Sequence, residues 1–502
     1  MGGLAMAMKR AGWHVTGSDV GIYPPISTYL KKQGVEYYTG WHPEKIGAPD
    51  LVVVGNVAGS ENPEWQYAQE KKLPYVSYPE LIAKYFVKPN SIVCAGTYGK
   101  TTTAALLSWI LTQAGMEPSY MFGGLSVNDE LPSAVCRSKA ERPSPIGQGL
   151  SPSLLGEWSV LEGDEYKTAR WDNSPKFARY SPTHLLLTAV QWDHADVYPT
   201  EASYFEAFEK LVKSVPKNGV IVASERVTSR SMEHVARIIK YGKDKKNDYI
   251  YNNIQHTKDG LQFNILVRDI CYVIRAKLIG EFMADNLCAA FAMAREIGID
   301  AEVIIKAIES FKGIKRRLEK RFEGDVTVID DIAHSPAKAH STLQTVRHVY
   351  FEPQRGEKSF EVSNDEPQKS TVIQNTNSSK DSSSPIRGSL GIRLLAIFEP
   401  NTGNRQIESI PSYDNQFIAA DEVIIPRLTQ IKHDPTKPEP MDGTKLAEVI
   451  GKTHPNVKYI DDDNKLINYL TNKLNPGDVV VFLGSHGFRG MIERLVVSFQ
   501  GK

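Results

Sequence analysis

The stretch at residues 91–103 constrains the fold of this chain more strongly than any other part of the sequence. It contains a short apolar run, two glycines, Gly96 and Gly99, and then Lys100 followed by three threonines. A glycine turn between an apolar strand and a helix lets backbone N–H groups converge on one point, toward which the helix directs its positive end. The stretch therefore predicts a phosphate-binding loop, in which Lys100 reaches the outer phosphates and the Thr101 hydroxyl binds Mg²⁺.

The spacing of this loop differs from the usual one. The common form G-x-x-x-x-G-K-[ST] would place a glycine at position 94, where this chain has Cys94. An ordinary strand–turn–helix is the alternative interpretation, but Gly-Lys-Thr directly after an apolar strand is seldom accidental. We therefore expect a shorter variant of the phosphate loop.

Length and charge limit the classes of protein to which the chain can belong. At 502 residues it is too long for a single hydrophobic core, and about three domains are expected. Fifty-nine basic and 59 acidic side chains give a formal net charge of zero, so no global field favours nucleic acid or an anionic membrane. The four cysteines lack metal-binding spacing, and no apolar run approaches the ~20 residues of a membrane span. We expect a cytoplasmic protein without nucleic-acid or membrane partners.

Residues 1–88 predict a Rossmann-like first domain in which helices and strands alternate. Apolar periodicity predicts a helix at 2–12, a strand at 13–19 and a buried strand at 50–55. Such a unit normally begins with a strand and a glycine-rich turn, whereas this chain opens at Met1-Gly2-Gly3, already inside that turn. The first strand is therefore expected to be missing, through either a truncated domain or a start site placed too late.

Residues 89–314 predict a second domain with a mostly parallel sheet that carries the phosphate loop. An acidic cluster at 160–166 is an expected strand that runs into a turn, and a strand expected at 183–190 leads to His194. Both clusters fall at strand ends, where ligand sites of α/β proteins form. Either cluster alone would more often be a group of polar side chains exposed to water, but together with the loop they indicate a site in which Glu162 faces the metal.

Residues 315–502 predict a third, Rossmann-like α/β domain. Its expected strands lie at 326–329, 393–398 and 478–484. The first of them leads directly to Asp331 and His334. The sequence as a whole therefore predicts an α/β protein of three domains.

Two polar, serine-rich stretches interrupt this pattern. One lies at about 137–156 in the second domain and the other at about 355–388 in the third. Both are too poor in apolar residues to build a core, so we expect loops or disorder there.

The loop Gly96-Thr97-Tyr98-Gly99-Lys100-Thr101-Thr102 resembles that of the Mur ligase family, whose members use ATP to join amino acids or peptides to UDP-N-acetylmuramic acid. Further similarities run from Gly2 to Met491 and leave only the two polar stretches unmatched. The resemblance implies three α/β domains, ATP and Mg²⁺ as cofactors, and a carboxylate that is first phosphorylated by ATP and then attacked by an amine.

The resemblance also implies roles for individual residues. The nucleotide would contact Gly96, Thr97, Gly99, Lys100, Thr101 and Thr102 with its phosphates, Asn286 with its adenine and Asp331 with its ribose. Metal ions would be held by Thr101, Glu162 and His194. Catalysis would depend on Lys100, on His194, on Arg317 near the phosphates, and on His334, which would face the reacting centre from the third domain.

Short matches favour one branch of the family, which couples the tripeptide L-alanyl-γ-D-glutamyl-meso-diaminopimelate to UDP-N-acetylmuramate in peptidoglycan recycling. These partners and a monomeric state are expected. In the third domain, Asn401 stands where relatives often carry an arginine, so Arg405 or another cation is expected to bind a substrate carboxylate.

Two alternatives to this branch stay open. One is a ligase that adds free L-alanine to the same acceptor. The other is an inactive relative that only binds nucleotide, which the unusual residues Tyr98, Met283 and Ser335 favour. The retained lysine and threonine of the loop, together with Glu162 and His194, argue against inactivity.

Overall fold

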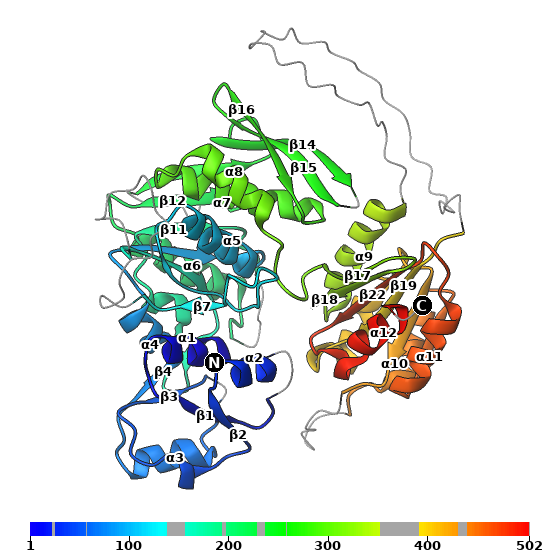
Figure 1. Cartoon of the computed structure of the whole chain (residues 1–502), viewed down its shortest axis with the longest axis horizontal. Helices are drawn as coiled ribbons and strands as arrows, with labels where there is room; N and C mark the ends of the chain where they lie inside the picture. Colours follow the sequence, from blue (N-terminus) through cyan, green and yellow to red (C-terminus); the bar gives the residue numbers. More distant parts are fainter. Residues whose placement is uncertain are drawn as a thin grey trace. The chain divides into compact units, whose positions relative to one another are not determined.

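The computed structural model describes residues 1–22, 26–56, 58–137, 156–192, 197–227, 236–257, 259–351, 391–429 and 439–500 (Figure 1). The chain divides into two compact units. The first comprises Met1–Glu319, Asp330–Ile332 and His486–Gly490, and the second comprises Lys320–Ile329, Ala333–Ser485 and Met491–Lys502. The polar stretch expected at 355–388 lies outside the described residues, as do residues 138–155 of the other one. The three-domain boundaries at 88 and 314 stay a prediction.

The N-terminal region alternates helices and short strands, as predicted. Its elements are α1 (Gly2–Arg10), β1 (Thr16–Asp19), α2 (Ile26–Lys32), β2 (Glu36–Thr39), η1 (Pro43–Lys45), β3 (Val52–Val54), α3 (Pro63–Glu70), β4 (Tyr75–Ser77) and α4 (Tyr78–Tyr85). The strands pair in parallel, β1 with β2 and β3 with β4, in two separate sheets. The strand expected at 50–55 is present as β3, but the prediction that it is buried is wrong. Only Val54 of β3 is buried, because β3 has a single partner strand in the described structure.

A ten-stranded sheet forms the centre of the first unit. Its strands are β5 (Asn90–Ala95), β6 (Ser119–Met121), β7 (Ala134–Val135), β8 (Trp158–Gly163), β11 (His184–Leu187), β12 (Val220–Ser224), β13 (Arg237–Gly242), β14 (Tyr249–Thr257), β15 (Gly260–Val267) and β16 (Ile270–Ala276). They lie in the order β16-β15-β14-β13-β12-β11-β5-β8-β6-β7, and the neighbours from β14 to β6 are parallel. The prediction of a mostly parallel sheet is confirmed.

Helices cover both faces of this sheet. They are α5 (Lys100–Gln113), α6 (Glu201–Ser214), α7 (Glu281–Glu296) and α8 (Ala301–Ser310). In β5, Ile92 and Cys94 share a core with α5, α7 and α8, whereas Val93 and Ala95 share the opposite core with α6. Successive side chains of a strand point to opposite faces, so a segment covered on both faces is apolar in succession, as residues 92–95 of β5 are. The apolar run before the loop therefore belongs to a strand inside the central sheet of the first unit.

The phosphate loop lies where the strand order of this sheet changes direction. From β5 the chain passes through α5 to β6 on one side, whereas β11, β12 and β13 lie on the other side. Open α/β sheets form their ligand sites at such a point, beyond the C-terminal ends of the strands. The loop after β5 therefore meets the ends of its two neighbours, β8 and β11.

Aromatic packing joins the N-terminal region to the central sheet. The hairpin of β9 (Lys167–Ala169) and β10 (Asp172–Pro175), which is followed by η3 (Lys176–Arg179), carries Trp171 at its turn. The Trp171 ring stacks on Trp65 of α3 with centroids 4.8 Å apart, and it meets the ring of Tyr75 in β4 at 5.4 Å. Buried Leu81 and Ile82 of α4 belong to the same core as α6. The two regions are therefore held together by packed side chains within the first unit.

The C-terminal elements form a six-stranded sheet with helices. They are β17 (Glu319–Glu323), β18 (Thr327–Asp331), α9 (Pro336–Phe351), β19 (Leu394–Glu399), η5 (Gly403–Arg405), η6 (Ile407–Tyr413), β20 (Glu422–Pro426), α10 (Gly443–Gly451), β21 (Val457–Ile460), α11 (Asp463–Lys473), β22 (Val479–Gly484), η7 (Phe488–Gly490) and α12 (Met491–Gln500). The strand order is β17-β18-β22-β19-β20-β21, and the neighbours from β22 to β21 are parallel. The three strands expected here correspond to β18, β19 and β22. No helix in the described ranges has the length and apolar character that crossing a bilayer requires.

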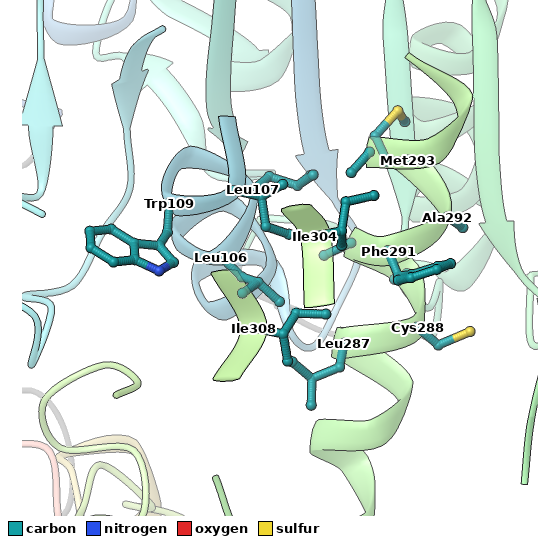
Figure 2. Close-up of a cluster of buried hydrophobic side chains, with 14 of the residues drawn as sticks. Leu106, Leu107, Trp109, Leu287, Cys288, Phe291, Ala292, Met293, Ile304 and Ile308 are labelled. Atoms are coloured by element: carbon teal, nitrogen blue, oxygen red, sulfur yellow. The ribbon is translucent and has the colours of Figure 1, made fainter. Parts of the chain in front are cut away.

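The core between the sheet and three helices stabilises the side of the first unit on which α5 lies. Figure 2 shows this core, with Trp109 from α5, Leu287 and Phe291 from α7, and Ile308 from α8. Every residue from 283 to 294 of α7 is buried. A helix buried on all sides needs small or apolar residues around its whole circumference, which explains the alanine-rich sequence of α7.

Replacing Ile308 by alanine should destabilise the first unit, because the side chain is fully buried in this core. The lost apolar burial and the remaining cavity should lower the free energy of unfolding by about 2–5 kcal/mol. The same substitution at Ile270, which is 57% exposed in β16, should cost less than about 1 kcal/mol. Urea unfolding followed by tryptophan fluorescence measures both changes. Equal losses in the two variants would contradict the packing described.

Candidate functional site

Two glycines give the loop after β5 its shape. Gly96 has a φ of +133° and Gly99 a φ of +80°, both in the left-handed region that favours glycine. A Cβ atom on Gly96 would lie 2.4 Å from Oγ1 of Thr188 and 2.6 Å from the carbonyl oxygen of Ala189. A Cβ atom on Gly99 would lie 2.3 Å from Oδ1 of Asn286 in α7. The backbone can approach its neighbours this closely only because both positions lack side chains.

Thr97 anchors the loop through its side chain. Its hydroxyl donates to the carbonyl oxygen of Gln191 at 2.8 Å and lies 3.0 Å from the hydroxyl of Tyr204 in α6. Its backbone N–H donates to the carbonyl oxygen of Ala189 at 2.6 Å. Thr97 is buried, as is Thr102 in the first turn of α5. Thr97 therefore shapes the loop, and the expected contacts of Thr97 and Thr102 with phosphate stay predictions.

Lys100, the first residue of α5, folds back over the loop. Its ammonium donates to the carbonyl oxygens of Gly96 at 2.6 Å and Thr97 at 3.3 Å. The two carboxylate oxygens of Glu165 lie 3.1 and 3.0 Å from the same ammonium. This role of Glu165 was not predicted. The signal in the sequence was a second glutamate three residues after Glu162, within the same acidic turn.

Thr101 and Glu162 lie together, as the prediction of a shared metal requires. The Thr101 hydroxyl donates to Oε1 of Glu162 at 2.7 Å, and the backbone N–H of Gly123 donates to Oε2 at 2.5 Å. The parallel pairing of β5 with β8, which sets Glu162 opposite Cys94, creates this proximity. The guanidinium of Arg317 donates to Oγ1 of Thr101 at 3.0 Å. Three predicted site residues from distant parts of the chain therefore meet at the N-terminal end of α5.

The oxygen atoms of Thr101 and Glu162 suit Mg²⁺, which proteins usually hold by one or two carboxylates together with substrate phosphates and water. In the part of the chain that the structure describes, no group of three or more His, Cys, Asp or Glu side chains is arranged for a metal ion. The pair therefore fits a Mg²⁺ whose other ligands come from phosphate and water. The third predicted ligand, His194, lies in the segment 193–196 outside the described residues, so its metal-binding and catalytic roles stay predictions.

The backbone around Arg317 is held in an unusual conformation. Arg316 has a φ of +61° and Leu318 a φ of +48°, left-handed values that residues with side chains seldom adopt. Oδ2 of Asp331 accepts a hydrogen bond from the Leu318 N–H at 2.7 Å, which helps to fix this segment. Such conformations persist where surrounding contacts enforce them, and they are frequent at functional sites. Arg317, which lies between these two left-handed residues, reaches Thr101 with its side chain.

The residue expected near the adenine lies in α7, and the residue expected near the ribose lies at the end of β18. Asn286 touches Gly99 from the first half of α7, and Phe282 at the start of that helix is exposed, whereas Met283 is buried. Asp331 is buried at the end of β18. An exposed aromatic ring can stack on a base, but the contacts of Asn286 with adenine and of Asp331 with ribose stay predictions.

His334 belongs to the second unit. Its backbone carbonyl oxygen accepts hydrogen bonds from the N–H of Asn401 at 3.3 Å and from the side-chain amide of Asn404 at 3.4 Å. The segments after β18 and β19 therefore lie side by side in that unit. The expected role of His334 at the reacting centre stays a prediction.

A cavity of about 210 Å³ adjoins Glu162 in the first unit, between the N-terminal region and the central sheet. Its lining includes Tyr78, Asp164, Lys176 and Tyr180. The Lys176 ammonium lies 2.6 Å from Oδ2 of Asp164. Burial raises the pKa of Asp164, but the Lys176 ammonium, the N–H of Tyr166 and the charge of Lys100 together outweigh burial, so the net pKa lies below the usual value. Burial raises the pKa of both tyrosines, so their hydroxyls stay protonated. The cavity therefore presents charged and hydrogen-bonding groups beside Glu162.

Residues 1–87 match the model of the Mur ligase family catalytic domain, and residues 94–294 match that of the Mur ligase middle domain. The chain is 31% identical over 353 residues to the UDP-N-acetylmuramate–L-alanyl-gamma-D-glutamyl-meso-2,6-diaminoheptandioate ligase of Haemophilus influenzae, covering 69% of this chain and 74% of that protein. The Escherichia coli protein of the same name is 28% identical over 512 residues, covering 99% and 95%. The crystal structure of a murein peptide ligase from Psychrobacter arcticus superimposes with a TM-score of 0.66 and 25% identity, over 100% of this chain and 97% of that one. The chain therefore belongs to the Mur ligase family.

Proposed function

We propose that this protein is an ATP-dependent ligase that joins the tripeptide L-alanyl-γ-D-glutamyl-meso-diaminopimelate to UDP-N-acetylmuramate. The observation that carries the proposal is the position of Glu162, whose carboxylate contacts Thr101 of the phosphate loop and also lines the neighbouring cavity. A phosphoryl donor at the loop and a carboxylate in the cavity would meet at this residue. The names of the two bacterial relatives support the choice of substrates.

The chemistry follows from the difficulty of making an amide in water. A carboxylate and an amine condense only if a carboxylate oxygen first becomes part of a leaving group. Transfer of the γ-phosphoryl group of ATP to the acceptor carboxylate releases ADP, and the peptide amine then attacks the acyl carbon and expels phosphate. Lys100, the N-terminal end of α5 and Arg317 would offset negative charge on the transferred group, and the contact of Arg317 with Thr101 supports this role.

Thr101 and Glu162 would hold the Mg²⁺ ion. When bound, Mg²⁺ neutralises charge on the phosphate oxygens during transfer. The hydrogen bond between the two residues keeps their oxygens 2.7 Å apart, and this proximity supports a shared Mg²⁺ ion. A cavity of about 210 Å³ can enclose only a part of a nucleotide sugar. Since Glu162 lines this cavity, the enclosed part would be the one that carries the reacting carboxylate, and Lys176 and Asp164 would contact it.

The structure does not favour Arg405 as the cation for the peptide carboxylate. The Arg405 side chain is only 8% exposed. Its guanidinium donates to the carbonyl oxygens of Thr429 at 2.9 Å and Met441 at 3.3 Å. These contacts tie two loops of the second unit together. We therefore propose that another cation binds the peptide carboxylates.

Lys100→Ala should lower the rate of phosphate release by a factor of about 10²–10³, because a preorganised charge that stabilises the transferred phosphoryl group is lost. The assay contains saturating ATP, Mg²⁺, UDP-N-acetylmuramate and tripeptide. Lys306→Ala, at an exposed position of α8, is the matched control and should leave the rate unchanged. A Lys100 variant with nearly normal turnover and normal folding would remove the loop from the mechanism.

Phosphate release should be much faster with the tripeptide than with free L-alanine, at equal concentrations of UDP-N-acetylmuramate and ATP. The proposed branch selects an amine that belongs to a peptide, and a shorter substrate loses the binding energy of the missing residues. A clear preference for L-alanine would replace the proposed activity by the alternative ligase. Absence of turnover with both amines, in a protein that still binds nucleotide, would favour the inactive relative.

A further inference from the structure

The Lys100 ammonium has its donors engaged by the protein itself. The acceptors are the carbonyl oxygens of Gly96 and Thr97 and the carboxylate of Glu165, at distances from 2.6 to 3.3 Å. A lysine has three N–H donors and no acceptor. A phosphate can therefore reach this ammonium only if one of the three contacts is exchanged or shared.

Burial makes Glu165 the strongest of these partners. The side chains of Glu165 and Lys100 are 1% and 14% exposed. A carboxylate at that depth is stable as an anion only when it is paired, and a bond between two charged groups is stronger than one to a neutral carbonyl. The positive charge of the loop is therefore balanced before any nucleotide binds.

Glu165 is itself held by side chains that return to the loop. The Tyr198 hydroxyl donates to the backbone carbonyl oxygen of Glu165 at 2.6 Å. The Tyr198 ring packs edge-on against Tyr204, with centroids 5.1 Å apart, and the Tyr204 hydroxyl lies 3.0 Å from that of Thr97. One connected group of side chains therefore fixes both Thr97 and the partner of Lys100. A residue whose backbone is fixed in this way can set the position of the ammonium through its carboxylate.

We propose that Glu165 is a positioning residue, which holds the Lys100 ammonium over the loop carbonyls and opposes the phosphates of a bound nucleotide. The inference rests on the proposed function, because it requires that the loop binds nucleotide phosphates. Glu165 has the same sign of charge as a phosphate, so it weakens nucleotide binding while it keeps the lysine in place for phosphoryl transfer. Removal of the carboxylate should therefore strengthen nucleotide binding and slow turnover.

Glu165→Gln keeps the size of the side chain and removes its charge. We expect the dissociation constant of ADP, measured by isothermal titration calorimetry with and without Mg²⁺, to fall by about 3- to 10-fold because a like charge beside the phosphates is lost. We expect kcat for phosphate release to fall by about 10-fold or more because the lysine is no longer held. A residue with a merely structural role would weaken ADP binding and lower kcat together.

Asp164→Asn is the charge-matched control, since it removes a neighbouring carboxylate that pairs with Lys176 rather than with Lys100. It should change the ADP dissociation constant by less than about 2-fold. Glu165→Asp keeps the charge and shortens the side chain by one methylene, so it tests the inference even if the glutamine variant does not fold. It should bind ADP within about 2-fold of the wild type and show a reduced kcat.

Three results would overturn the positioning role. The first is unchanged or weaker ADP binding by Glu165→Gln. The second is ADP binding by Asp164→Asn that is as much tighter than wild type as that of Glu165→Gln. The third is a Glu165→Asp variant with either impaired ADP binding or wild-type kcat. In each case normal ADP binding and turnover by the wild type would leave the proposed function intact. A wild-type protein that binds no ADP would overturn the proposed function and this inference together.

Discussion

The candidate site depends on the register in which β5 pairs with β8. These strands are separated by α5 and by more than sixty residues of sequence, yet their parallel pairing sets Glu162 opposite Cys94 at the end of the sheet where the loop begins. Glu162 shares its face of β8 with Val160, which lies in the same core as α5. A shift of one residue would turn the carboxylate to the other face of the sheet. The apolar residues that bury both faces of these strands therefore also fix the contact between Glu162 and Thr101.

Charge balance is the second organising feature of the site. Lys100 pairs with Glu165, Lys176 pairs with Asp164, and Arg317 reaches the hydroxyl that Glu162 also contacts. Buried charges are stable only with such partners. Phosphates and a substrate carboxylate would compete with these internal partners for the same cations. Substrate binding would therefore exchange existing contacts for new ones, rather than fill a site of unpaired charges.

Local sequence patterns were sufficient to predict the loop. Its functional residues Gly96, Gly99, Lys100 and Thr101 lie within six positions, so their relative placement depends on local backbone geometry alone. The position of Glu162 beside the loop was predictable because this residue ends an apolar strand, and strand ends meet at one edge of a parallel sheet. The proximity of Arg317 to Thr101 came from family resemblance. The left-handed backbone conformations of Arg316 and Leu318, on either side of that arginine, could not be predicted from any local sequence pattern.

Other features need the tertiary structure. The bond between Lys100 and Glu165 depends on how a turn after β8 folds over the loop, and the sequence shows only a row of acidic residues there. The half-burial of β3 was missed because apolarity predicts a strand but not how many strands cover it. Arg405, which was expected to face substrate, is buried against backbone carbonyls, since its position follows from the packing of two loops.

We infer that the acceptor carboxylate is phosphorylated beside Glu162, by ATP bound at the loop, before the amine attacks. UDP-N-acetylmuramate labelled with ¹⁸O in its carboxylate, incubated with ATP, Mg²⁺, tripeptide and the protein, tests this most directly. A carboxylate oxygen that has accepted the phosphoryl group leaves with phosphate, so mass spectrometry should find one ¹⁸O atom in each phosphate released per amide formed. Amide formation with unlabelled phosphate would contradict the account.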